Sequence, residues 1–304
     1  MPDLLTHTIF SRLVRNEVKS VIVKSSIERH MNLFQLGAQG PDFFFYYKPL
    51  SPFSRKISNI GRMMHDKSTA TFFLGAVKEI EKTKTDSEQF FVYLLGFLCH
   101  FYLDKNVHPY VDYVDKHGVW DFNGQLSKMT HYYLEYTIDT RLWKEYENKE
   151  AVDQNLASLI RVDKMPAEII KYFHNYFQTE YDINVPEKAI RASFSNMFSI
   201  LNILYDPDYR KTLLRKLPTP RKYYVHDPFP QCDVLNNGRN VWCYKDEKIP
   251  MNESVADLMM TAKKEAVNTI DKIVDYLNGD KKIKLEEIIE NVSYNTNRLG
   301  QTHQ

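Results

Sequence analysis

Histidines and carboxylates recur four residues apart at two places in the first half of this chain. His100, Asp104 and His108 follow one another at that interval, and His131 and Glu135 repeat it further on. Side chains four residues apart project from the same face of a helix. Imidazole nitrogens and carboxylate oxygens suit zinc, so two such helices in a bundle core could hold metal ions. Two neighbouring ions could clamp a phosphoryl group and activate a water molecule.

A purely structural interpretation of the same residues stays open at this point. A single histidine among apolar neighbours is usually a hydrogen-bonded core residue, and histidine–acid pairs also occur on solvated helices. His100, however, lies within the apolar run Phe90–Leu103, where an unpaired polar group would be costly. That placement, together with the second pair further on, favours the metal site.

The overall composition gives no sign of a nucleic-acid partner. Of the 304 residues, 40 are Lys or Arg and 39 are Asp or Glu, so no global field favours nucleic acid or an anionic membrane. Three cysteines are too few for a disulfide framework and indicate a reducing compartment. The chain does not open on a secretory signal, and its most apolar stretch, 90–99, is about half the length that spans a bilayer. We therefore predict a cytoplasmic protein without a transmembrane segment.

Helical periodicity dominates the segments that must position these side chains. With only ten glycines and no sustained alternation of apolar and polar residues, the sequence predicts an all-α fold. We expect a single domain over residues 1–304, a multi-helix bundle with a metal cluster in its core and the metal motifs within residues 1–140. The predicted helices cover residues 5–22, 69–82, 90–108, 126–146, 151–161, 166–179, 186–204, 207–215 and 252–278.

Two irregular segments interrupt this helical pattern. Residues 37–54 carry three prolines and two glycines, which predicts a loop. Residues 217–250 are rich in proline, asparagine and glycine, and a segment of that length favours a functional role. His226 and Asp227 within it could line a substrate cleft.

The first 140 residues carry the motifs MPDLLTH, LGAQGPDFF, RMMH, GFLCHFYLDKNVHPY and HYYLEYTID, in that order. As an ordered set they resemble the zinc-dependent phospholipase C family. A more distant resemblance links them to the plant and fungal single-strand nucleases built on the same helical scaffold. Over the rest of the chain the resemblance is weaker.

The resemblance implies a set of ligands for two or three zinc ions and one catalytic acid. The ligands are His65, His100 and Asp104 for one zinc, His108, His131 and Glu135 for a second, and His7 for a third that would share Asp104. In the secreted phospholipases the third zinc is also held by a processed N-terminal amine, whereas this sequence begins Met1-Pro2. Asp42, in Gly-Pro-Asp, matches the aspartate assigned as general base or water-orienting group.

The resemblance also suggests residues around the substrate and behind the ligands. Phe43 matches one aromatic position of the choline pocket, but Arg62 occupies the second and is better suited to phosphate than to a quaternary ammonium. A more anionic phosphate ester is therefore as good a candidate as choline. His30 is expected to hydrogen-bond the 37–42 loop or to bind metal. Asp139 is expected either to orient a histidine ligand or to be a surface acid.

These observations favour a zinc-dependent phosphoric ester hydrolase that uses a metal-activated water to cleave a phosphodiester. Phospholipids are among the candidate substrates. Two alternatives stay open. The dyad His65-Asp66 resembles the signature of the HD-type nucleotide phosphohydrolases, which are also all-helical. The third interpretation is a non-catalytic helical protein with structural or regulatory zinc.

Overall fold

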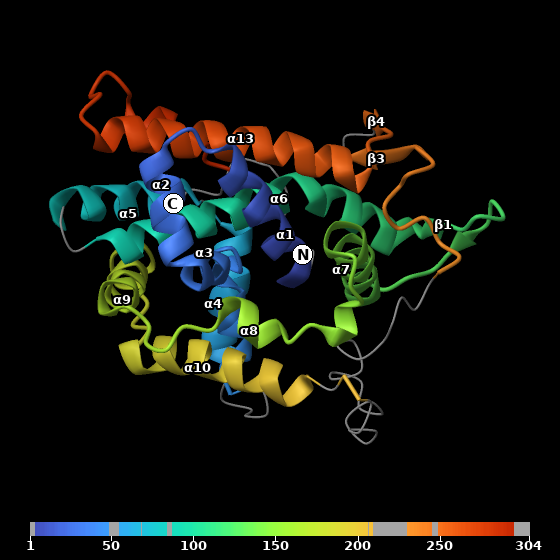
Figure 1. Ribbon diagram of the computed structural model, residues 1–304, viewed down its shortest axis with the longest axis horizontal. Coiled ribbons are helices and arrows are strands. Elements are labelled where there is room, and N and C mark those ends of the chain that lie inside the picture. Colours follow the sequence, from blue (N-terminus) through green and yellow to red (C-terminus); the bar gives the residue numbers. More distant parts are fainter. Residues whose placement is uncertain are drawn as a thin grey trace.

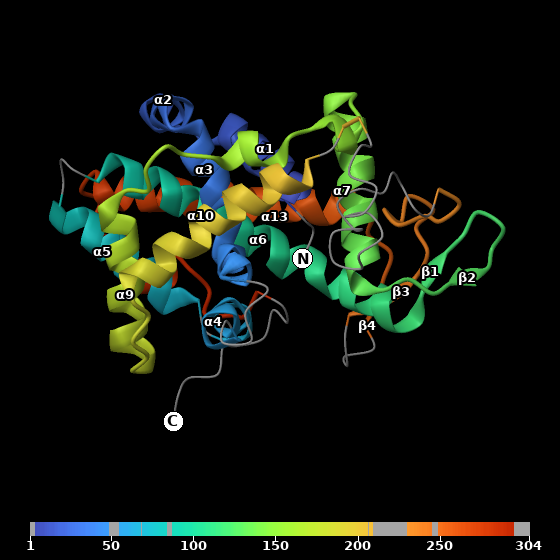
Figure 2. The ribbon, with the colours of Figure 1, turned by 90° about the horizontal axis from the view of Figure 1, so that it is seen from below.

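The computed structural model describes residues 4–48, 55–67, 69–83, 87–205, 207–208, 230–244 and 249–294. His226, Asp227 and the greater part of the predicted 207–215 helix lie outside these ranges. The chain folds into helices that surround one long central helix, with two short hairpins at one end (Figures 1 and 2).

The described elements follow in chain order. The α-helices are α1 Leu4–Glu17, α2 Val21–Arg29, α3 Met31–Gly37, α4 Arg55–Asp66, α5 Ala70–Thr83, α6 Glu88–His117, α7 His131–Glu147, α8 Leu156–Ile160, α9 Ala167–Tyr181, α10 Glu187–Leu204 and α13 Val255–Leu277. The 3-10 helices are η1 Gly40–Tyr46, η3 Ala151–Asp153 and η5 Leu285–Glu287. The antiparallel hairpins pair β1 Val119–Trp120 with β2 Leu126–Ser127, and β3 Trp242–Tyr244 with β4 Ile249–Met251. The all-α prediction is confirmed.

The central helix α6 is buried along most of its 30 residues because its sequence is apolar on nearly all sides. Helices α3 and α13 pack along it, and α1, α5 and α7 contact it as well (Figures 1 and 2). The helix continues past His108, where we expected it to end, runs through Pro109 and ends at His117, and the following Gly118 has φ +98°. No helix in the described part of the chain is both long enough and apolar enough to cross a bilayer.

Three predicted helices have wrong boundaries, each where a side chain accepts from a backbone amide. The predicted 151–161 helix is divided into η3 and α8, and the side chain of Asn155 accepts from Ala157 N at the start of α8. The predicted 5–22 helix is two helices, since the hydroxyl of Ser20 accepts from Val23 N and starts α2 afresh. The predicted 126–146 helix starts only at His131, where the carboxylate of Asp115 accepts from the His131 amide at 2.9 Å. Residues before it form the β1–β2 hairpin instead.

The last described segment folds back onto the centre of the molecule. The hydroxyl of Thr69 donates to Val292 O at 2.9 Å, and the amide of Tyr294 donates to His65 O at 3.1 Å. The ammonium of Lys105, on α6, contacts Glu290 at 2.7 Å. These contacts place the last described residues beside His65 and the middle of α6.

Candidate metal centre

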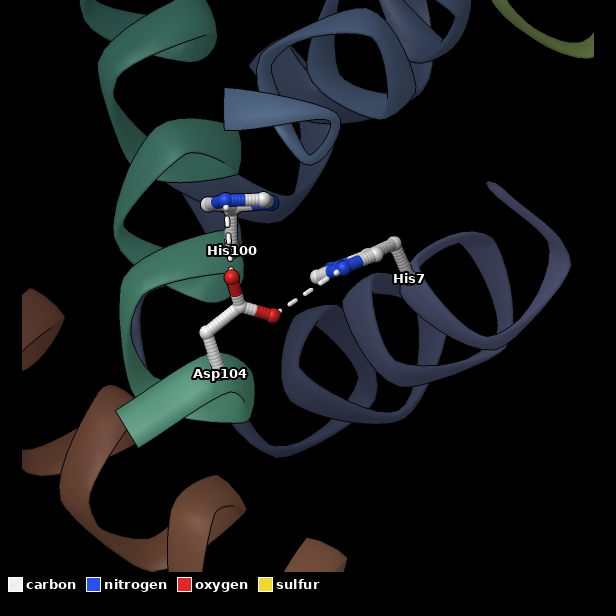
Figure 3. Close-up of side chains that lie close together, drawn as sticks. All are labelled: His7, His100 and Asp104. Atoms are coloured by element: carbon white, nitrogen blue, oxygen red, sulfur yellow. Dashed lines mark ion pairs between the residues drawn. The ribbon is translucent and has the colours of Figure 1, made fainter. Parts of the chain in front are cut away.

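Asp104 lies at the centre of a fully buried group of histidines. It follows His100 by one turn of α6, so the two side chains share a face. Its Oδ2 is 3.2 Å from Nε2 of His100, and its Oδ1 is 3.3 Å from Nε2 of His7 on α1. The two oxygens point to different histidines (Figure 3). The carboxylate is therefore placed as a bridging ligand would be.

His65 approaches the same carboxylate from the end of α4. Its Nδ1 faces the carbonyl of Gly61 at 2.7 Å and must donate to it, so Nε2 carries the lone pair. That Nε2 lies 3.6 Å from Oδ2 of Asp104 and 3.3 Å from Nε2 of His100. It is also 3.3 Å from Oδ1 of Asp42, which comes from η1. Imidazole nitrogens and carboxylate oxygens from three separate elements thus converge.

A second group joins the later part of α6 to the start of α7. The ligand atoms of His108, His131 and Glu135 lie within 4.8 Å of one another. Within the group, Nε2 of His131 is 2.8 Å from Oε1 of Glu135, one turn along α7. Burial lowers the pKa of both histidines, and the negative charge of Asp104 partly counteracts that effect. The second group therefore lies within electrostatic range of the first.

The donor set has the properties of a cation site. Within the described residues, neither oxygen of Asp104 has a hydrogen-bond partner, and neither do the ring nitrogens of His7 and His108. A buried carboxylate without such partners is costly. A divalent cation among these donors would compensate for that cost. Nitrogen and carboxylate oxygen donors are those that zinc prefers, so the residues fit zinc.

Burial sets the protonation state of most of these donors. It lowers the pKa of His7 to about 4 and of His65 to about 3, so both rings are neutral and able to bind metal at neutral pH. Burial would also lower the pKa of His100, but the Asp104 carboxylate outweighs it and raises that pKa. Burial would raise the pKa of Asp104, yet His100 and His7 hold it well below its usual range.

The depressed pKa values predict that metal-free protein loses stability in acid. Burial lowers the pKa of His131 to about 3, as it lowers those of His7 and His65. Below about pH 6.5 the unfolded chain therefore binds more protons than the folded chain, and each histidine lowers the free energy of unfolding by on the order of 1 kcal/mol per pH unit. Full stability is present above pH 6.5 and is lost toward pH 3–4. The raised pKa of His100 acts in the opposite direction, but on one residue against four, since burial also lowers the pKa of His108.

Urea unfolding of chelator-treated protein between pH 7.5 and 4.5 measures this effect. His7→Gln should flatten the dependence on pH, whereas His117→Gln, at an exposed position, should not. An equal slope in the two variants would contradict the assignment.

Gly40 allows η1 to approach the ligands. It adopts φ +52°, and a Cβ atom there would lie 2.1 Å from the ring of His100. The positive φ turns the chain from α3 into η1 and delivers Asp42 to the cluster.

Asp139 is buried and contacts the start of α1. Its carboxylate accepts from the amides of Leu5 at 2.8 Å and Thr6 at 2.9 Å. These are among the first amides of α1, which have no partner within the helix. The buried acid on α7 thereby fixes the end of α1 that carries His7.

The residues expected around the substrate lie in different environments. Phe43 is buried and stacks on Phe194 with ring centroids 3.8 Å apart, so it belongs to the aromatic core and offers no face to a substrate. Phe45, two residues on, is partly exposed and stacks 6.1 Å from His65. Arg62 is exposed on α4. His30 lies 3.7 Å from Glu88 and belongs to none of the three groups.

Three residues that we did not expect also belong to this region. Nδ1 of His108 lies 3.6 Å from Asp112, and Nδ1 of His131 lies 4.0 Å from Asp115. Carboxylates behind metal-bound histidines commonly orient the ring. The spacing of four between His108 and Asp112 was a visible signal in the sequence. Tyr294, whose ring centroid is 5.3 Å from that of His65, had no such signal.

Comparison with known proteins gives one match. A family model described as zinc dependent phospholipase C matches residues 6–188. No curated protein and no solved structure matches the chain significantly. The matched range includes all three candidate ligand groups.

Proposed function

The chain belongs to the zinc-dependent phospholipase C family, and on that premise we propose that it hydrolyses a phosphodiester, with a phospholipid as the natural class of substrate. The observation that supports this most is the convergence of two donor groups at His100 and Asp104, whose two oxygens face His100 and His7, with a third group at the junction of α6 and α7. Zinc bound there would polarise the phosphoryl group, lower the pKa of a water molecule and stabilise the leaving oxygen.

The roles of the chain's own residues follow from their positions. His7, His65 and His131 are held neutral by burial and are ready to donate lone pairs. Asp42 is partly exposed at the edge of the cluster, with Oδ1 3.3 Å from His65. From that position it can orient the attacking water and accept its proton. Arg62, exposed on the same helix as His65, is suited to pair with a non-reacting phosphate oxygen.

The ligand count favours catalysis over a structural role. Within the described residues, the group His7, His100 and Asp104 and the group His108, His131 and Glu135 each offer three side chains. Catalytic zinc usually has three protein ligands and an open position, whereas structural zinc has four. This argument weighs against the non-catalytic alternative. Turnover of a soluble chromogenic phosphodiester by zinc-loaded protein tests it, since a structural zinc protein would give none.

Asp42→Asn is the variant that tests the proposed chemistry. We expect it to keep its zinc and to lose roughly 10²-fold or more in kcat, because it removes a proton acceptor beside the reacting water. Zinc content by atomic emission serves as the control. Unchanged turnover at full zinc content would remove Asp42 from the mechanism.

A further inference from the structure

The β1–β2 hairpin displays three large apolar side chains to solvent. Trp120 is 37% exposed, Phe122 70% and Leu126 53%. Trp120 and Leu126 are direct cross-strand partners, so their side chains share one face, and Phe122 lies at the turn. Figures 1 and 2 both show the hairpin projecting beyond the helices. We call these three residues the apolar hairpin face.

Hydrogen bonds hold the turn of the hairpin and tie the hairpin to a neighbouring segment. The Asp121 carboxylate accepts from the amides of Asn123 at 2.9 Å and Gln125 at 2.7 Å, which fixes the turn. The amide of Phe122 donates to Gln231 O at 2.9 Å. A neighbouring segment therefore supports one edge of the hairpin, and the aromatic side chains cannot simply collapse onto the body.

The base of the hairpin adjoins the second metal group. Residues 117–130 leave the end of α6 and return at the start of α7, and Asp115 closes this excursion by accepting from the His131 amide at 2.9 Å. His131 is itself a member of that group, and its side chain is 29% exposed. One member of the metal group is therefore partly exposed where the chain returns from the hairpin.

The charges beside the hairpin indicate which surface it would meet. Between residues 115 and 132 the charged side chains are Asp115, Lys116, Asp121 and Lys128, two of each sign, which sum to zero. Both aspartates bind backbone amides, while both lysines are exposed. A neutral apolar face with exposed lysines at its base suits a surface that carries both charges. The aromatic and leucine side chains can enter the interface while the lysines reach phosphates.

We propose that the apolar hairpin face docks the protein onto a zwitterionic phospholipid surface and presents lipid phosphodiesters to the adjoining metal groups. The hydrolysis of the docked lipid rests on the proposed function, but the docking itself does not require catalysis. It explains why Phe122 is exposed on a fixed turn.

The test compares Phe122→Ser/Leu126→Ser with a matched control, Val21→Ser/Ile22→Ser. Val21 and Ile22 are similarly exposed, at 78% and 79%, but start α2 at the other end of the molecule (Figure 2). Co-sedimentation with phosphatidylcholine vesicles measures partitioning. We expect the hairpin variant to partition about tenfold more weakly or worse, since it withdraws two apolar side chains from the interface, and the control to match the unaltered protein.

Kinetics separate this inference from the proposed function. The hairpin variant should hydrolyse vesicle lipid at least about tenfold more slowly while its turnover of a soluble chromogenic diester stays within about twofold. Equal vesicle binding by both variants would overturn the inference, as would binding that requires anionic lipid. Absence of turnover of the soluble diester by zinc-loaded, unaltered protein would instead reject the proposed function.

Discussion

Replacing Asp104 by asparagine is expected to lower the zinc content by at least one ion per chain and to reduce phosphodiester hydrolysis to background. The buried carboxylate is the only negative group within 3.6 Å of His7, His65 and His100 together in the described residues. An amide cannot bridge two cations through two anionic oxygens, and it leaves their charge uncompensated in a buried site. Atomic emission of protein purified without chelators measures the metal.

Asp66→Asn is the matched control because it makes the same substitution beside the same cluster. Asp66 follows His65 directly but is exposed at the end of α4 and belongs to none of the donor groups. Full zinc content and activity are expected. If Asp66→Asn lost metal while Asp104→Asn kept it, the HD-type nucleotide phosphohydrolase would become the better assignment.

Gly40→Ala is expected to disable the centre without touching a ligand. The left-handed backbone costs an alanine about 1–2 kcal/mol. The new methyl group would meet three ring atoms of His100 at 2.1 to 2.5 Å, so the ring must move, and such overpacking costs roughly a further 1–3 kcal/mol. Because His100 faces both His7 and His65, its displacement should reduce zinc content as well as stability.

Gly124→Ala is the matched control for the stability that is lost when alanine occupies a left-handed backbone position. Gly124 also has a positive φ, +77°, but a Cβ atom there meets nothing within 4 Å. The Gly124→Ala variant should lose only the part of the free energy of unfolding that comes from the backbone conformation. It should keep its zinc and its turnover of a soluble diester. Urea unfolding together with zinc analysis measures both variants. Equal zinc content in the two would show that His100 tolerates the methyl group.

The donor pairs that lie on one helix could be predicted from the sequence. The interval of four predicts that His100 and Asp104 share a face, and that His131 and Glu135 do so as well, because helix geometry alone fixes those relations. His7, His65 and Asp42 come from separate elements, and nothing local relates them to α6. Their place beside it was available only through the family resemblance.

Other features depend on tertiary contacts that no local pattern encodes. Phe43 and Phe45 are both aromatic residues of one short 3-10 helix, and only the packing against Phe194 decides which of them enters the core. The acidic residue Asp139 continues the face of α7, yet its partners are amides more than a hundred residues earlier in the chain. The hairpin was missed because residues 126–130 carry an apolar periodicity compatible with a helix, whereas Asp115 starts α7 at His131.

The carboxylate of Asp139 beneath the first amides of α1 has a consequence for biosynthesis. A chain leaving the ribosome exposes His7 early, but the acid that anchors its helix is made 132 residues later, and the segment that delivers Tyr294 beside His65 later still. The metal centre can therefore form only after residue 139 has been made. A truncated nascent chain would carry the donors as separate weak sites, open to whichever divalent metal the cell offers first.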